Sequence, residues 1–204
     1  MFAAWFSGAG SLMGERQGIL FLVVGPSGVG KDSLIDGARR RLADDAGYHF
    51  PVRSITRPED AMGEDHQAVT VAGFECLEAA GNFMLSWQAH GHRYGIPKTA
   101  EQALEDGRSV VVNVSRQLLD QARRRWPAVR IVLVSAPREV LRARLVTRGR
   151  ETAQEVQKRL DRAGSYEVVG DDVREVVNAD RLEHAVERFM AVLEAERHDM
   201  AKVR

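Results

Sequence analysis

The chain has 204 residues, 44% of them hydrophobic, and its 29 basic side chains (Lys and Arg) balance 29 acidic ones. This length suits one domain with a proper core, and the lack of net charge argues against a nucleic-acid partner. A single cysteine, Cys76, excludes a disulfide framework and a cysteine-based zinc site and favours a reducing, cytoplasmic location. No apolar run is long enough to span a bilayer, so we expect no membrane partner.

The N-terminal segment is apolar but short. It has neither the basic region nor the cleavage site that would mark a signal peptide. We therefore expect an N-terminal extension over residues 1–17 and a single domain over residues 18–204.

From residue 18 on, apolar runs alternate with amphipathic segments. Buried strands are predicted over residues 19–24, 52–56, 109–115, 129–136 and 174–178, and a strand with a following turn over 82–91. Helices are predicted from Lys31 onward and over residues 99–107, 117–126, 138–149, 152–163 and 181–196. This alternation implies an α/β domain with a mostly parallel sheet that helices cover on both faces.

Two further expectations concern the last helix and the segment from about 57 to 75. In the last helix, the apolar spacing points five side chains toward the core: Leu182, Ala185, Val186, Phe189 and Leu193. The stretch from about 57 to 75 is polar and weakly patterned. It suggests a long excursion from the sheet, and long ordered excursions are usually functional.

The loop after the first strand carries the strongest chemical signal. Residues 25–32 read GPSGVGKD, which matches the phosphate-binding pattern G-x-x-x-x-G-K-[ST] except at its last position. Glycines allow the backbone to turn N–H groups inward, and the following helix adds the positive end of its dipole. The preceding strand and following helix favour this interpretation over a plain glycine-rich turn. The predicted phosphate-binding residues are Gly25, Pro26, Ser27, Gly28, Val29, Gly30, Lys31, Asp32 and Ser33.

Asp32 stands where a Ser or Thr would ligate Mg²⁺. An acidic residue in the first turn of a helix is favourable toward the helix dipole, which is the alternative interpretation. Beside a triphosphate, however, a bare carboxylate would be repelled, whereas Mg²⁺ between the two removes the repulsion. We favour Asp32 as a Mg²⁺ ligand, direct or through water, over Ser33, which points in a different direction around the helix.

Other segments resemble a known family. The loop GPSGVGK resembles that of guanylate kinases, as do ITR at 55–57, HGHRYGIP at 90–97 and RGRETAQEVQKRL at 148–160. The chain resembles more closely still the ribose 1,5-bisphosphate phosphokinases, a guanylate-kinase-like family of phosphonate breakdown. Five of their motifs occur in order: GPSG-x-GKDS, R-x-ITR, LSW-x-A-x-G-x-x-YG, VN-x-SR and RGRE, at residues 25–33, 53–57, 85–95, 112–116 and 148–151.

The chain departs from guanylate kinases where those enzymes read the base. Leu85 and Ser86 stand where a guanine-reading Glu is expected, and Asn113 and Ser115 replace the two acids of the LDID strand. Losing these hydrogen-bond partners removes a preference for guanine. An arginine is also missing near Asp60, while Arg53 is added. The arginine changes fit a sugar phosphate that lacks a base. The loss of the acid at position 113 and the new acid at Asp32 suggest that the metal-binding carboxylate has moved from the sheet to the phosphate loop.

The resemblance implies a P-loop NTPase fold, a reaction and roles for residues. ATP, with Mg²⁺, would phosphorylate ribose 1,5-bisphosphate to 5-phosphoribosyl 1-diphosphate, releasing ADP. The acceptor would bind in an excursion over about residues 50–98, and a lid would span about 147–165. Because the attacking group would be an ionised phosphate oxygen, no general base is needed.

The residue roles that go with this reaction fall into two groups. The groups acting on the transferring phosphoryl are Lys31, which reaches the β- and γ-phosphates, and the lid arginines Arg148 and Arg150. The predicted substrate contacts are Arg53, Arg57, Tyr94 and Arg159. For each arginine a solvated charge is the alternative, and for Tyr94 a core position. His66, His90 and His92 are interpreted as surface residues, and Trp87 as core.

Two other functions compete with this interpretation. A nucleoside monophosphate kinase is disfavoured by the missing base-reading acids. A non-catalytic guanylate-kinase-like binding module is disfavoured by the intact loop with Lys31. The partners expected are ATP and a small sugar phosphate, and the sequence leaves a monomer and a homodimer both open.

Overall fold

The computed structural model describes residues 17–58, 65–149, 152–164 and 167–202. Apart from Gln17, the predicted N-terminal extension lies outside the described residues, as do Asp60 and Arg150. Among the described helices, none combines the length and the apolar character that crossing a membrane requires.

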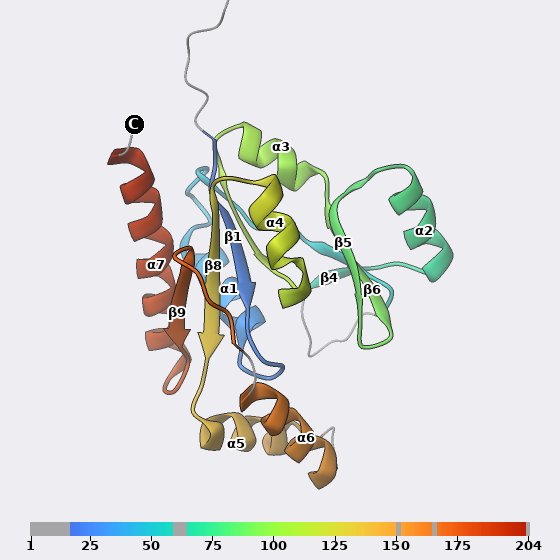
Figure 1. Ribbon diagram of the computed structural model, residues 1–204, viewed down its shortest axis with the longest axis vertical. Coiled ribbons are helices and arrows are strands. Elements are labelled where there is room, and N and C mark those ends of the chain that lie inside the picture. The colour runs from blue at the N-terminus through green and yellow to red at the C-terminus, as the bar shows by residue number, and fades with distance from the viewer. Residues whose placement is uncertain (1–16, 59–64, 150–151, 165–166, 203–204) are drawn as a thin grey trace, which may run out of the picture.

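The centre of the fold is a five-stranded parallel sheet (Figure 1). Its order is β2 (Tyr48–His49), β7 (Ser109–Asn113), β1 (Leu20–Val24), β8 (Val129–Ser135) and β9 (Val173–Val177). Every neighbouring pair is parallel. The fully buried pattern of β1 reflects its central place, because a parallel strand covered on both faces needs an unbroken apolar run.

Helices cover both faces of this sheet, as predicted. Alternate side chains of β1 point to opposite faces: Phe21 and Val23 pack with residues of α1 (Lys31–Arg41) and α7 (Leu182–Lys202). Leu20 and Leu22 pack with residues of α3 (Thr99–Glu105), the short 3₁₀ helix η1 (Arg116–Leu118) and α4 (Leu119–Arg125). The predicted α/β class, with a mostly parallel and doubly covered sheet, is confirmed.

A second, four-stranded sheet lies beside the first. Its order is β4 (His66–Ala68), β3 (Arg53–Ile55), β6 (His92–Pro97) and β5 (Phe83–Ala89), with β3 and β4 parallel and the other pairs antiparallel. Helix α2 (Val71–Ala79) packs on it through Phe74, whose ring stacks on Phe83 with centroids 4.6 Å apart.

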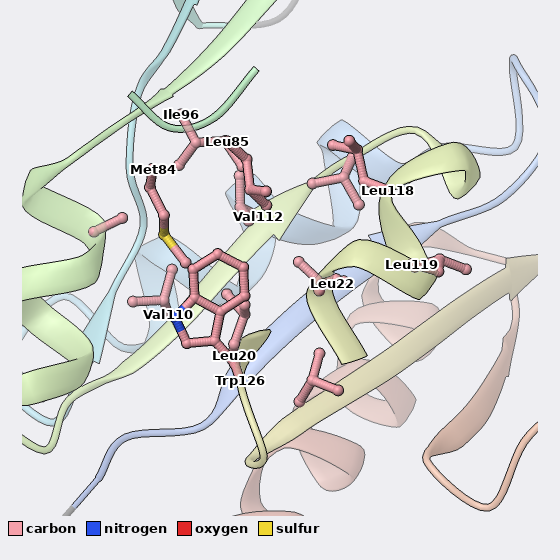
Figure 2. Packing of buried hydrophobic residues seen from close by; sticks show 14 of the residues in the cluster. Leu20, Leu22, Met84, Leu85, Ile96, Val110, Val112, Leu118, Leu119 and Trp126 are labelled. Atoms are coloured by element: carbon pink, nitrogen blue, oxygen red, sulfur yellow. The ribbon is translucent and has the colours of Figure 1, made fainter. Parts of the chain in front are cut away.

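One apolar cluster joins the two sheets. Figure 2 shows Met84, Leu85 and Ile96 of the four-stranded sheet in the same cluster as Val110 and Val112 of β7. Trp126, directly after α4, belongs to it as well. This shared core holds the edge of the four-stranded sheet against the main sheet, beside the strand that ends at Asn113.

The last two helices before β9 form a separate unit at the end of the sheet (Figure 1). Helix α5 (Arg138–Arg148) packs on α6 (Ala153–Gly164) through a small cluster of Leu141, Leu145, Val156 and Leu160. Helix α5 is capped by Gly149, whose positive φ of 63° suits a helix C-cap.

The structure corrects several sequence-based expectations. The strand and turn predicted over 82–91 are confirmed as β5 and the turn at His90 and Gly91, both with positive φ, but the return strand β6 was not predicted. The polar stretch 57–75 contains β4 and the start of α2 among its described residues. Leu182 was expected to face the core but is 38% exposed, because it is the first residue of α7. The other four predicted core residues of that helix are buried.

Helix α7 also runs past residue 196, where the prediction ended. Glu196 is 5% exposed and forms ion pairs with Arg130 of β8 and Arg174 of β9. An acidic side chain is rarely buried unless it is paired. The helix therefore continues because its C-terminal half is fastened to the sheet, an interaction between distant residues that local periodicity does not reveal.

Candidate active site

The glycine-rich loop lies between β1 and α1, at the carboxyl end of the parallel strands. Gly25 and Gly30 have positive φ values of 152° and 96°, which only glycine adopts readily. A Cβ atom on Gly25 would also lie 2.3 Å from the carbonyl oxygen of Val134. Lys31 folds back over the loop, and its Nζ donates to the carbonyls of Gly25 at 2.8 Å and Pro26 at 3.1 Å.

Asp32, in the first turn of α1, meets the end of β7. The amide Nδ2 of Asn113 donates to Asp32 Oδ1 at 2.7 Å, and Arg53 Nη2 lies 3.7 Å from the same oxygen. The Asp32 side chain is 45% exposed. The carboxylate is therefore fixed at one oxygen and open to solvent, which leaves it able to take a further partner.

Arg53 is the buried member of this group. It is 6% exposed, and its Nη1 donates to the carbonyl oxygen of Asn113 at 2.7 Å. The guanidinium carbon also lies 5.9 Å from the ring centroid of Trp87 and 5.8 Å from that of Tyr94. These distances are within the range of cation–π attraction. Arg53 thus connects β3 to the strand end that holds Asp32.

Tyr94 and Trp87 form the aromatic side of the four-stranded sheet near Arg53. They face each other across β5 and β6 and stack with centroids 5.2 Å apart and planes 8° from parallel. Trp87 is buried, as predicted, whereas Tyr94 is half-buried. Tyr94 and the buried Arg53 therefore lie on the same face of this sheet.

A cleft lies between α1 and the strands that hold Arg53 and Asn113. Its polar lining consists of Asp32, Asp36, Arg39, Arg53, Asp65 and Asn113. Burial raises the pKa of the Asp36 carboxyl, Arg39 opposes this change, and the charge of Asp32 adds to it. Arg39 Nη1 bonds to Asp65 at 3.1 Å, so α1 is tied to the segment before β4.

The remaining predicted acceptor residue, Arg57, lies just after β3 and close to β4. Arg57 is half-buried, and its carbonyl oxygen lies 3.2 Å from Nε2 of His66. The surface interpretation of His66 was wrong: the residue is 6% exposed, since β4 packs directly against β3. At the expected place of the guanine-reading acid, Ser86 Oγ donates to Glu78 of α2 at 2.5 Å.

The structure brings one predicted lid residue to the loop. Arg159 of α6 donates from Nη1 to Ser27 Oγ at 2.7 Å. Arg148 ends α5, and its side chain is outside the described part of the structure, as is the whole of Arg150. Arg159 was expected at the substrate, and its described contact is with the phosphate loop.

Two residues that contact the loop were missed from the sequence. Asn178, after β9, and Arg144 of α5 both donate to the carbonyl oxygen of Val29. Asn178 had one available signal, because a polar residue at the carboxyl end of a parallel strand lies where ligands bind in open α/β sheets. Arg144 had none, since it is one of several arginines on an amphipathic helix.

Comparison with known proteins agrees with this fold. The family model described as guanylate kinase matches residues 17–196. The chain therefore belongs to the guanylate kinase family. A guanylate kinase structure from Anaplasma phagocytophilum superposes with a TM-score of 0.64 at 20% identity, covering 89% of this chain and 87% of that one.

Curated relatives that are similar in sequence have names that specify a substrate. The protein named ribose 1,5-bisphosphate phosphokinase PhnN of Rhizobium etli is 43% identical over 89% of this chain and 92% of its own length. The protein of that name from Thiobacillus denitrificans is 44% identical over 81% of this chain and 91% of its own. A bifunctional ribose 1,5-bisphosphokinase-thymidine phosphorylase of Cupriavidus necator is 44% identical, and the match spans 30% of its length.

Proposed function

We propose that the protein transfers the γ-phosphoryl group of ATP to ribose 1,5-bisphosphate, which gives 5-phosphoribosyl 1-diphosphate and ADP. A non-bridging oxygen of the acceptor's 1-phosphate attacks the γ-phosphorus, and the bond from that phosphorus to the β-phosphate oxygen breaks. The names and high coverage of the PhnN relatives support this substrate. The observation within this chain that carries it is the group of Asp32, Asn113 and Arg53, which replaces the acidic strand end that reads a base.

The phosphate loop binds the triphosphate in this proposal. Backbone N–H groups of residues 25–32 and the N-terminal end of α1 face the phosphate oxygens. Lys31, which bonds to two loop carbonyls, exchanges these neutral acceptors for the β- and γ-phosphates. A charged acceptor makes the stronger hydrogen bond, so the exchange is favourable.

The residues present fit a magnesium ion at Asp32. Mg²⁺ commonly takes one or two carboxylates and completes its shell with water and substrate phosphates. Within the described ranges, no three His, Cys, Asp or Glu residues lie close enough to form a metal cage. Asp32 would therefore be the protein ligand, with Asn113 holding one of its oxygens. The ion would neutralise charge on the transferring group.

The acceptor occupies the surface of the four-stranded sheet in this proposal. Its phosphates meet Arg53, Arg57 and Tyr94, because a guanidinium matches phosphate in a bidentate geometry. Arg148, Arg150 and Arg159 belong to a lid over about residues 147–165, and the acceptor region and the lid are parts of a single domain over 18–204. The contact from Arg159 to Ser27 supports a lid that reaches the loop.

A coupled assay of ADP release tests the proposal. We expect ADP to form with ribose 1,5-bisphosphate and far less with GMP, AMP or UMP at equal concentration. Lys31→Ala should abolish the release while the exposed Arg40→Ala on the same helix keeps it. Efficient turnover of a nucleoside monophosphate would reject the acceptor, and ATP binding that survives in Lys31→Ala would favour a non-catalytic module.

A further inference from the structure

The carbonyl oxygen of Val29, inside the phosphate loop, accepts two side-chain hydrogen bonds. Asn178 Nδ2 donates to it at 2.8 Å and Arg144 Nη1 at 3.3 Å. The two donors come from the segment after β9 and from α5, so three segments distant in sequence meet at one peptide group. The backbone conformation of the loop does not by itself require these two side-chain hydrogen bonds.

The donors are themselves fixed. Asn178 is 2% exposed, and its backbone N–H donates to the carbonyl oxygen of Ser135 at 2.7 Å. Arg144 bonds to the backbone oxygen of Asn178 at 2.9 Å and to its Oδ1 at 3.1 Å. Because Arg144 occupies Oδ1, the amide of Asn178 has one orientation, with Nδ2 toward Val29.

Because a peptide group is planar, fixing the carbonyl of Val29 also fixes the direction of the N–H of Gly30. The C=O and N–H of a trans peptide point in opposite directions, and the described chain contains no cis peptide bond. With the carbonyl of Val29 held toward Asn178 and Arg144, the N–H of Gly30 must point to the other side. Among the described residues, none accepts a hydrogen bond from that N–H group.

We propose that Asn178 and Arg144 are positioning residues, which hold the Val29–Gly30 peptide so that the Gly30 N–H is aimed at the phosphate chain of the nucleotide. The inference rests on the nucleotide-binding part of the proposed function. It assigns a task that preorganised donors perform best, because a donor already aimed at its anion needs no reorganisation when the anion arrives.

The contact with Asn178 requires a glycine at position 30. Its φ of 96° already excludes most side chains, and a Cβ atom there would lie 2.5 Å from Asn178 Nδ2. The glycine is thus required both by the turn and by the close approach of the amide that holds the peptide. The neighbouring Gly28 is similarly close to α5, since a Cβ atom on it would lie 2.8 Å from Leu145.

The arrangement also links the loop to the proposed lid. Arg144 is on α5, one helical turn before Arg148, where the helix ends and the lid segment begins. A rotation of α5 would move the Arg144 guanidinium relative to the Val29 carbonyl. The orientation of the Gly30 N–H is therefore sensitive to the position of the helix that leads into the lid.

Calorimetric binding of magnesium tripolyphosphate, which has no base or sugar, tests the inference against magnesium ATP. Asn178→Ala should weaken binding of both ligands by about tenfold, the equivalent of a hydrogen bond to a charged group. Arg144→Ala should do the same, and Arg144→Lys, which keeps a donor, should recover part of the loss. Arg142→Ala, an exposed change on the same helix, is the matched control.

Two outcomes overturn the inference. If Asn178→Ala weakens ATP binding but leaves tripolyphosphate unchanged, the residue acts on the base or sugar and does not position the loop. If neither ligand is affected, the peptide needs no anchor. Should Asn178→Ala fail to fold, Arg144→Ala and Arg144→Lys carry the same prediction. These measurements involve no acceptor, so failure of the ribose 1,5-bisphosphate assay leaves them interpretable.

Discussion

Asn113 donates a hydrogen bond of 2.7 Å to the carboxylate of Asp32, and this bond joins the end of β7 to the first turn of α1. The position occupied by an acid in guanylate kinases thus carries an amide, and the acid stands across from it on the phosphate loop. The two positions remain in contact, so an exchange of charge between them is physically reasonable.

The first prediction concerns Asp32 as the magnesium ligand. Asp32→Asn should raise the Mg²⁺ concentration needed for half-maximal ATP binding severalfold, because the neutral amide is a weaker ligand for a hard cation. Titration of ATP binding with Mg²⁺ by calorimetry measures this directly. Asp44→Asn, at an exposed position after α1, is the control. An unchanged Mg²⁺ requirement would remove Asp32 from the metal site.

The second prediction exploits the pairing of the two side chains. Asn113→Asp would place two carboxylates at hydrogen-bond distance, and their repulsion should weaken Mg-ATP binding or lower the melting temperature. In the double variant Asp32→Asn/Asn113→Asp, the amide and carboxylate are interchanged and the hydrogen bond is restored. The double-mutant cycle should therefore show favourable coupling between the substitutions. Simple additivity of the two effects would contradict the contact.

The third prediction concerns Arg53. Arg53→Lys cannot reach both the Asn113 carbonyl and the neighbourhood of Asp32 in the way a planar guanidinium does. We expect the KM for the acceptor to rise by about tenfold or more, with little change in the Kd of ATP. Steady-state kinetics with either substrate varied separates the two effects. Equal weakening of both substrates would show that Arg53 acts through the fold and not at the acceptor.

The fourth prediction addresses the lid. Arg159→Ala should lower kcat by about 10²-fold, because a charged donor near the transferring group acts mainly in the transition state. Arg162→Ala on the same helix should retain nearly normal turnover. Rapid-quench measurement of the phosphoryl-transfer step distinguishes chemistry from product release. A loss confined to the KM of ATP would place Arg159 in ground-state binding instead.

The fifth prediction is a pH dependence of stability. Burial raises the pKa of Asp172, but two hydrogen bonds of 2.8 Å from Arg123 outweigh this and leave the pKa below that of an ordinary aspartate. The pair therefore stabilises the fold above about pH 3.9, the pKa of an unfolded aspartate, and this stabilisation is lost as the pH falls through the lower folded pKa.

Asp172→Asn tests that linkage. At pH 7 it should reduce the free energy of unfolding by about 1–3 kcal/mol, and the difference from the parent should shrink below about pH 4. Urea unfolding at a series of pH values measures the effect, with the exposed Asp171→Asn as control. A difference that stays constant down to pH 2 would mean that the charge of Asp172 is not involved.

The main sheet and its helices were predictable because local pattern determines them. The unbroken apolar run of residues 20–24 and the glycines after it place a buried strand and a phosphate loop without further information. Strands β4 and β6 were missed because their pairing with β3 depends on partners far along the chain, and a polar, three-residue strand such as β4 has no clear period.

The site shows the same division. Motif spacing predicted roles for Lys31 and Asp32, but nothing local indicates that Arg144 and Asn178 converge on Val29, since 34 positions separate the two donors in the chain. Nor could the burial of Arg53 be predicted, because it depends on a carbonyl of β7 in the main sheet and on two aromatic rings from other strands of its own sheet. Contacts that cross between sheets are set by packing, and periodicity does not encode them.

Phosphorus NMR of the reaction products tests the central claim most directly. With ATP, Mg²⁺ and ribose 1,5-bisphosphate, we predict that the acceptor's 1-phosphate resonance is replaced by a pair of coupled diphosphate resonances, at a rate matching the appearance of ADP. The 5-phosphate resonance should persist as a monoester. ATP consumption without a new diphosphate ester, or preferential conversion of GMP to GDP in a mixture of both acceptors, would contradict the account.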